Sequence, residues 1–271
     1  MAQGLTDVKL EITPPLARIT FCRPDSYNSF RAKTYQDLQA AMQTVARRDD
    51  VFVTVVTGEG KFFSSGADFN DAYSPVSADP IEVLETFRKH LGGLTVAVTQ
   101  SFINHPKVLV IALNGPVVGI PAALISHADL IYASDSAYLY TPFATIGICA
   151  EGGSSFGFLS RMGFGPAMEA LMFGRKYSAH ELERFGFVNR VFPEASFHAE
   201  VEKLLKTNLA VSNLPTLLKT KELTRTYIRN HANLANAQEW DEVSKCFASG
   251  APAESFKRML QAKMGAKKSK L

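Results

Sequence analysis

The sequence lacks the features that mark several large classes of protein. Its 271 residues include three cysteines, which are widely spaced and match no metal or redox motif: Cys22, Cys149 and Cys246. We therefore expect reduced thiols in an intracellular protein. A net charge of +3 is too small to indicate nucleic-acid binding. No apolar run is long enough for a membrane span, and the first residues lack the basic and apolar regions of a signal peptide.

What the sequence does contain is the material of an ordinary globular domain. Hydrophobic residues make up 46% of the chain and charged residues 20%, which leaves ample apolar material for a core. The length fits one domain with a small appendage. Periodicity predicts a hairpin over 8–22, strands at 51–56, 107–113, 130–133 and 137–140, and helices at 34–47, 81–102 and 122–126.

Strand patterns stop near residue 195. Beyond that point the periodicity predicts helices only, at 204–218, 221–231, 235–247 and 253–264. We therefore expect an α/β protein in two parts. Residues 1–195 would form the core that binds the ligand and carries the chemistry, and residues 196–271 would form a C-terminal helical subdomain.

A segment with small residues, 61–69, directly follows the strand predicted at 51–56 and a glycine-rich turn. Ser64, Ser65 and Gly66 leave the backbone open to a ligand, because glycine permits close approach and unusual dihedral angles. The amide of Ala67 can then point outward as a hydrogen-bond donor. Taken alone, the segment also fits an ordinary connection between a strand and a loop.

A second segment of this kind follows the strand predicted at 107–113. Asn114-Gly115-Pro116 indicates a turn, and the small apolar residues after Gly119 indicate a helix start that tolerates Pro121. Free amides at such a start favour a negative oxygen. The two segments would each supply one amide, from Ala67 and Ile120, and such a pair can form an oxyanion hole for a thioester carbonyl.

With other stretches of the chain, these segments resemble the crotonase (enoyl-CoA hydratase/isomerase) superfamily. The likeness runs in family order over about residues 8–264, and its further matching stretches are 23–30, 128–130, 164–167, 174–179 and 185–191. The resemblance implies a crotonase-type ββα spiral core, an acyl-CoA thioester substrate, and homotrimers or hexamers in which the helical subdomain takes part. It implies no metal and no cofactor, since coenzyme A belongs to the substrate.

Two positions speak against hydration. Hydratases of this superfamily carry two catalytic glutamates, and the matching positions here are Ala123 and Phe143. Addition of water to a double bond needs a carboxylate that positions the water, and neither side chain can do this.

One carboxylate does lie near these positions, in Glu151-Gly152-Gly153. A glutamate before a helix is often explained by the helix dipole alone. Here, however, the flanking residues are apolar or small, which would raise the pKa of Glu151 toward the range of a base that works near neutral pH. The resemblance agrees, because peroxisomal Δ3,Δ2-enoyl-CoA isomerases carry their catalytic glutamate in a matching Glu-Gly-Gly segment.

The remaining predicted site residues would bind the substrate. Phe69, Phe143 and Ile148 would form an apolar wall that excludes water, beside Ser65, Gly66 and Gly119. Asp68 competes with Glu151 for direct chemistry, although in the family this position is mainly structural. Ser26 and Lys257 are weaker candidates for contacts with the CoA part, because lysines are usually just solvated.

The last three residues, Ser269, Lys270 and Leu271, match the peroxisomal address that an import receptor reads; a frayed basic tail is the alternative. The leading hypothesis is therefore a Δ3,Δ2-enoyl-CoA isomerase of the peroxisome matrix. It would move a 3-cis or 3-trans double bond to give trans-2-enoyl-CoA in fatty-acid β-oxidation. Two alternatives are a related crotonase-fold hydratase or isomerase of a secondary-metabolite pathway, and a non-catalytic acyl-CoA-binding protein.

Overall fold

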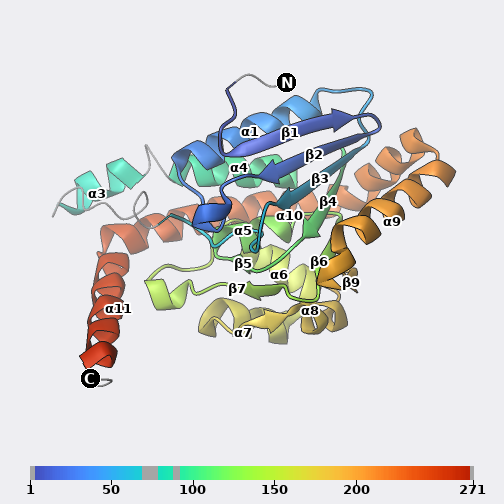
Figure 1. Ribbon diagram of the computed structural model, residues 1–271. Coiled ribbons are helices and arrows are strands. Elements are labelled where there is room, and N and C mark those ends of the chain that lie inside the picture. Colours follow the sequence, from blue (N-terminus) through green and yellow to red (C-terminus); the bar gives the residue numbers. More distant parts are fainter. Residues whose placement is uncertain (1–3, 69–78, 88–91, 269–271) are drawn as a thin grey trace.

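The computed structural model describes residues 4–68, 79–87 and 92–268 (Figure 1). Its main sheet has six strands in the order β1-β2-β3-β4-β6-β9. β1 and β2 are antiparallel, and each later strand is parallel to its neighbour. The bounds are β1 Val8–Thr13, β2 Leu16–Phe21, β3 Val53–Gly58, β4 Val108–Leu113, β6 Leu130–Ser134 and β9 Arg190–Phe192.

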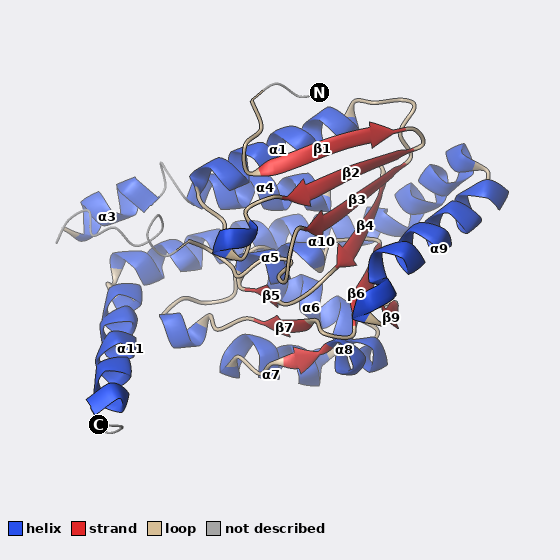
Figure 2. Cartoon of the chain, in the orientation of Figure 1, coloured by secondary structure: helices blue, strands red, loops and turns tan. Residues whose placement is uncertain are grey.

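A smaller sheet lies below the main one (Figure 2). It consists of β5 (Val117–Val118), β7 (Tyr138–Tyr140) and β8 (Tyr177–Ser178), in the order β5-β7-β8. β5 pairs in parallel with β7, so the segment after β4 is fixed beside the segment after β6. This arrangement brings two strand-to-helix junctions close together.

Helices cover both faces of the main sheet. α1 and α4 pack on one face around a core that includes Leu38, Met42 and Phe102, and α9 packs on the other face through Phe197 and Val201. The helices are α1 Ala32–Ala46, α3 Pro80–Phe87, α4 Gly93–Ile103, α5 Ile120–Ile125, α6 Ser154–Met162, α7 Phe164–Phe173, α8 Ala179–Phe185, α9 Phe197–Val211, α10 Leu214–Ala248 and α11 Ala251–Lys268. None of the helices described is long and apolar enough to span a membrane.

The predicted hairpin, the strands and the helices at 34–47 and 122–126 are confirmed within a few residues. The single helix predicted at 81–102 is found as α3 and α4, and residues 88–91 between them lie outside the described residues. The predicted division of the last helices was wrong, because residues 221–231 and 235–247 belong to one helix, α10. The real break comes earlier, between α9 and α10. There the Asn213 side chain accepts a hydrogen bond from the Thr216 amide, and Pro215 lies in the first turn. Both features start a helix, whereas no glycine or proline interrupts residues 216–248.

Candidate active site

A cavity of about 250 Å³ opens where the two junctions meet. Eight of the residues predicted for the site line it: Ser65, Gly66, Ala67, Gly119, Ile120, Phe143, Ile148 and Glu151. They come from three separate stretches of the chain, 65–67, 119–120 and 143–151, which the pairing of the strands brings together. A cavity of this kind, apolar with a few convergent polar groups, is the usual form of a small-molecule site.

The loop geometry frees the amide of Ala67. A parallel bridge pairs Phe30 with Ala67: the Phe30 amide donates to the Gly66 carbonyl, and the Asp68 amide donates to the Phe30 carbonyl, both at 2.8 Å. Those two bonds use the groups on either side of Ala67. Its own N–H therefore points away from Phe30, and no residue in the described part of the chain accepts it.

The second amide belongs to Ile120, the first residue of α5. The first N–H groups of a helix have no partner inside the helix, and this one has no other acceptor among the described residues. Gly119 places it there with φ 65° and ψ −134°, a conformation that L-residues avoid. A β-carbon on Gly119 would lie only 3.8 Å from the Cα of Gly66. The two loops that carry the free amides are therefore in contact.

Glu151 borders the same cavity from a tight turn before α6. Gly152 and Gly153 both have positive φ, at 68° and 73°. A β-carbon on Gly152 would lie 2.5 Å from Ile120 Cδ1 and 2.9 Å from the Ala123 Cβ, so only glycine lets the turn pack against α5. No described group donates a hydrogen bond to the Glu151 carboxylate. Burial, with a smaller contribution from the negative charge of Glu239, raises the pKa of Glu151 from 4.5 to about 8.

Comparisons with known proteins identify the family of the chain. Residues 11–262 match the model of the family described as enoyl-CoA hydratase/isomerase. The chain belongs to this family. It is 37% identical over 274 residues to "Delta(3,5)-Delta(2,4)-dienoyl-CoA isomerase" of Pyricularia oryzae, with 94% of this chain and 96% of the relative covered. It is 30% identical to "3,2-trans-enoyl-CoA isomerase" of Saccharomyces cerevisiae, with 93% of each chain covered.

Two further relatives extend the comparison. "Enoyl-CoA delta isomerase 3, peroxisomal" of Mus musculus is 34% identical over 88% of this chain and 73% of its own length. Among solved structures, an enoyl-CoA hydratase/isomerase from Pseudoalteromonas atlantica superimposes with a TM-score of 0.84 at 22% identity, covering 95% of this chain and 98% of the other. That structure supports the crotonase-type fold alone.

Some residues predicted for the site of this enoyl-CoA hydratase/isomerase family member do not line the cavity. Asp68 accepts a hydrogen bond from the Ser29 hydroxyl at 3.0 Å and lies 3.6 Å from the Arg23 guanidinium, so it holds loops together. The Ser26 hydroxyl donates to the Arg23 carbonyl, and Lys257 is exposed on α11. Their contacts with CoA stay predictions. Phe69 and residues 269–271 lie outside the described residues.

Sequence reasoning missed the wall that the C-terminal helices supply. Phe247, at the end of α10, and Met259, on α11, line the cavity opposite the core. The remaining lining residues come from the core: Tyr35, Thr95, Val118, Tyr140, Pro142, Thr145 and Ile146. No motif marks Phe247 or Met259, since each is one apolar residue within a long, mostly polar helix. Only the path of the chain shows that they border this cavity.

Glu239, which lies on α10, was also not predicted from the sequence. Its two carboxylate oxygens accept hydrogen bonds from the amides of Gly153, at 2.5 Å, and Ser155, at 2.7 Å. His127 holds the same turn, with its Nε2 at 2.8 Å from the Gly152 carbonyl oxygen. In the sequence Glu239 is one acid among many on a charged helix, and no local signal distinguishes it.

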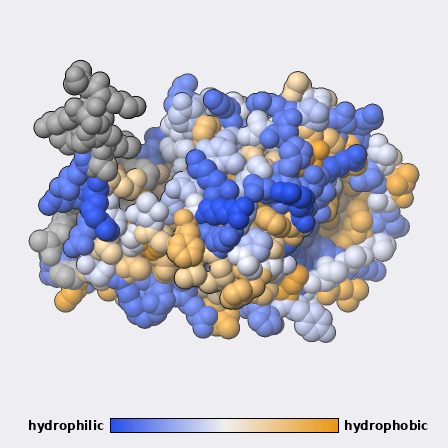
Figure 3. Space-filling model, turned by 90° about the horizontal axis from the view of Figure 1, so that it is seen from below, coloured by the Kyte–Doolittle hydropathy of each residue, from blue (hydrophilic) through white to orange (hydrophobic). Residues whose placement is uncertain are grey.

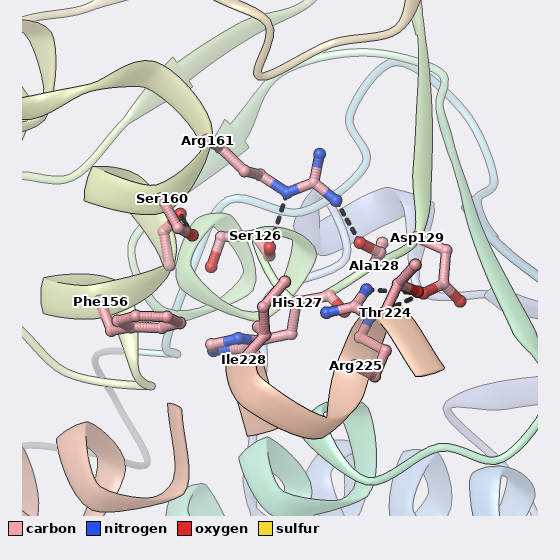
Figure 4. A pocket seen from close by; sticks show the side chains of 11 residues that line it. Ser126, His127, Ala128, Asp129, Phe156, Ser160, Arg161, Thr224, Arg225 and Ile228 are labelled. Atoms are coloured by element: carbon pink, nitrogen blue, oxygen red, sulfur yellow. Dashed lines mark hydrogen bonds and ion pairs between the residues drawn. The ribbon is translucent and has the colours of Figure 1, made fainter. Parts of the chain in front are cut away.

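A second cavity, of about 290 Å³, lies at the other end of α5 (Figure 4). Arg161 donates to the Ser126 and Ala128 carbonyls, and Arg225 donates to the His127 carbonyl at 2.7 Å. The figure shows both guanidinium groups turned toward the chain that follows α5. Cations suit the carbonyl end of a helix. We interpret these arginines as supports for α5, whose first amide faces the other cavity.

Proposed function

We propose that the protein is a Δ3,Δ2-enoyl-CoA isomerase. One observation carries the proposal: in the part of the chain that the structure describes, Glu151 is the only carboxylate that lines the cavity and has no hydrogen-bond donor, and the amides of Ala67 and Ile120 beside it have no acceptor. The names of its relatives, which are enoyl-CoA and dienoyl-CoA isomerases, support the same class of reaction.

The mechanism follows from these three groups. Ionised Glu151 removes a proton from C2 of a 3-enoyl thioester, and the electrons move into the carbonyl to give a dienolate. The amides of Ala67 and Ile120 donate to the oxygen on which this negative charge develops. Glu151, now protonated, returns the proton at C4, and the double bond ends between C2 and C3. Because C2 and C4 are both bonded to C3, one carboxylate can reach both.

The raised pKa of Glu151 suits this role. A carboxyl group with a pKa of about 8 is a stronger base than an exposed glutamate, and it is still partly ionised near neutral pH. Phe143 and Ile148 lie beside it in the cavity and exclude water. Ala123 is fully buried under the turn of Glu151. Neither Ala123 nor Phe143 can orient a water molecule for hydration.

A second reaction has a specific observation in its favour. The relative from Pyricularia oryzae is named for dienoyl-CoA isomerisation, in which a 3,5-diene becomes a 2,4-diene. That reaction delivers the proton at C6, farther from C2 than one carboxylate easily reaches. Among the described residues that line the cavity, Glu151 is the only acid. The geometry therefore favours the shorter transfer to C4.

The test uses the purified protein and four substrates: cis-3-hexenoyl-CoA, trans-3-hexenoyl-CoA, 2-hexenoyl-CoA and a 3,5-dienoyl-CoA. We expect fast conversion of the 3-enoyl esters to the conjugated 2-enoyl product. Faster turnover of the dienoyl ester would replace the proposal with the second reaction. Comparable hydration of 2-hexenoyl-CoA would favour a hydratase, and binding without turnover of any ester would favour a non-catalytic acyl-CoA-binding protein.

We also propose that the enzyme works in the peroxisome matrix, in fatty-acid β-oxidation. The tripeptide Ser269-Lys270-Leu271 and the relative named as peroxisomal support this location. A secondary-metabolite pathway is the alternative for the same chemistry.

Homotrimers or hexamers are proposed for the assembly. Phe164, Met172 and Phe173 of α7 are exposed, Phe173 by 79%. The face on the side of α7 shows apolar patches between hydrophilic areas (Figure 3). Exposed apolar patches of this kind mark contact surfaces. Sedimentation of the purified protein would give the number of subunits directly.

A further inference from the structure

Glu239, together with His127, holds the turn of Glu151 from outside it. Helix α6 begins after Gly153, which has no side chain to cap the helix. The carboxylate of Glu239 takes that place, with one oxygen on the Gly153 amide and the other on the Ser155 amide. Its side chain is buried, with 7% of the residue exposed. A carboxylate that accepts two short hydrogen bonds from backbone amides fixes both the position and the direction of the turn.

The same contacts place a negative charge beside Glu151. Glu239 has two amide donors, whereas Glu151 has none among the described residues. Burial raises the pKa of Glu239, and the hydrogen bonds from the two backbone amides oppose this rise. For Glu151, burial and the charge of Glu239 both raise the pKa. In the pair, the first negative charge therefore belongs on Glu239. Glu151 becomes a base only when the pair loses a second proton and so carries a second negative charge.

The other titratable groups that face this turn are neutral near pH 7. Burial lowers the pKa of His127 to about 4, so its ring carries no charge there. Burial and the neighbouring Cys246 raise the pKa of Cys149 to about 12, so it remains a thiol. From α4, Thr95 and Val96 lie beside Glu151, and neither has a charge. Among the described residues, Glu239 is thus the charged neighbour that acts on Glu151.

We propose that Glu239 is a positioning residue of the isomerase, which orients the turn of Glu151 and sets the pH at which Glu151 becomes a base. The proposal rests on the proposed function for its kinetic consequence. It assigns to α10 a part in the chemistry, although Glu239 acts on the substrate only through Glu151.

Three variants separate the two parts of this role. Glu239→Gln removes the charge and leaves one oxygen to accept an amide, so the rising limb of kcat/KM against pH should move about one unit toward lower pH. Glu239→Asp keeps the charge but shortens the side chain, so the limb should stay while the plateau of kcat falls about tenfold or more. Glu242→Gln removes an exposed acid of the same helix, paired with Lys245, and should change neither.

A second measurement does not depend on activity. The carboxyl carbon of Glu151, assigned by its loss in Glu151→Gln, can be titrated by ¹³C NMR in the parent and in Glu239→Gln. We expect the same shift toward lower pH. An unchanged titration and an unchanged kinetic profile in a folded Glu239→Gln protein would overturn the inference. A shifted titration in a protein without isomerase activity would instead count against the proposed function alone.

Discussion

Glu151→Gln should inactivate the enzyme and, at alkaline pH, make the folded protein more stable. The amide has the shape of the carboxyl group but cannot accept the C2 proton. A positioned acid–base group contributes about 10²–10⁴-fold, and the loss of the sole proton carrier should reach the upper end of that range or exceed it. The stability effect has a separate origin, because the parent must bury a negative charge that the variant lacks.

The size of the stability effect follows from the pKa of Glu151. In the folded protein it is about 8, against an ordinary value of 4.5. Because the folded state holds the proton more tightly, this group's contribution to stability is fully present below about pH 4.5 and is lost as the pH rises through 8. At about 1.4 kcal/mol for each pH unit, the full loss is about 5 kcal/mol, of which about 4 kcal/mol falls between about pH 5 and about pH 9.

Urea unfolding of parent and variant at these two pH values measures the difference. Most other titrating groups are common to both proteins, so their effects largely cancel when the pH-dependent change in one is subtracted from that in the other. The variant should gain about 4 kcal/mol relative to the parent on going from pH 5 to pH 9, with unchanged m-values. A gain below about 1 kcal/mol would refute the raised pKa of Glu151 in the folded protein. Activity of the variant within a few-fold of the parent would remove Glu151 from the mechanism.

Three other outcomes are expected. Hydration of trans-2-hexenoyl-CoA should be negligible beside isomerisation, because Ala123 and Phe143 cannot orient water; similar rates in the two assays would contradict this. Removal of residues 269–271 should leave a tagged protein in the cytosol, in cells without the parent protein, while the purified protein keeps its activity; continued import would place the signal elsewhere. Asp129→Asn should destabilise the fold by about 3–5 kcal/mol in thermal or urea unfolding, since it leaves the buried Lys221 and the half-buried Arg225 without their 2.6–2.8 Å partner; a loss under 1 kcal/mol would contradict this.

The parts of the fold that follow from local pattern could be predicted from the sequence. The hairpin was found because two alternating runs flank Pro14-Pro15, and β3 and β4 because β-branched residues form short apolar runs. The continuity of α10 was missed because its buried side, which includes Lys221, Asn236 and Glu239, is partly polar and changes partners along its length. One part faces Asp129 and another faces α4 and α6, so the periodicity shifts although the backbone remains helical.

The residues of the candidate site likewise fall into those that a local sequence pattern predicts and those that it does not. Ala67, Ile120 and Glu151 could be picked out because each lies in a short motif whose small residues have a direct geometric purpose. Glu239 and Phe247 could not, because their place depends on how a distant helix crosses the core. A contact made across 84 or 86 residues of sequence leaves no local trace in either partner.

The spacing of contact residues along helix α10 is fixed by the parts of the fold that they contact. Arg225 and Glu239 are fourteen residues apart, about four turns, so both project from one side of the helix. Arg225 contacts the chain that follows α5, and Glu239 contacts the turn that precedes α6. A single residue inserted between them would turn everything beyond it by about 100° and advance it by about 1.5 Å. The carboxylate would then miss the amides of α6, and Phe247 would leave the cavity. The length of this segment is therefore fixed by the site, although most of its exposed side chains are free to vary.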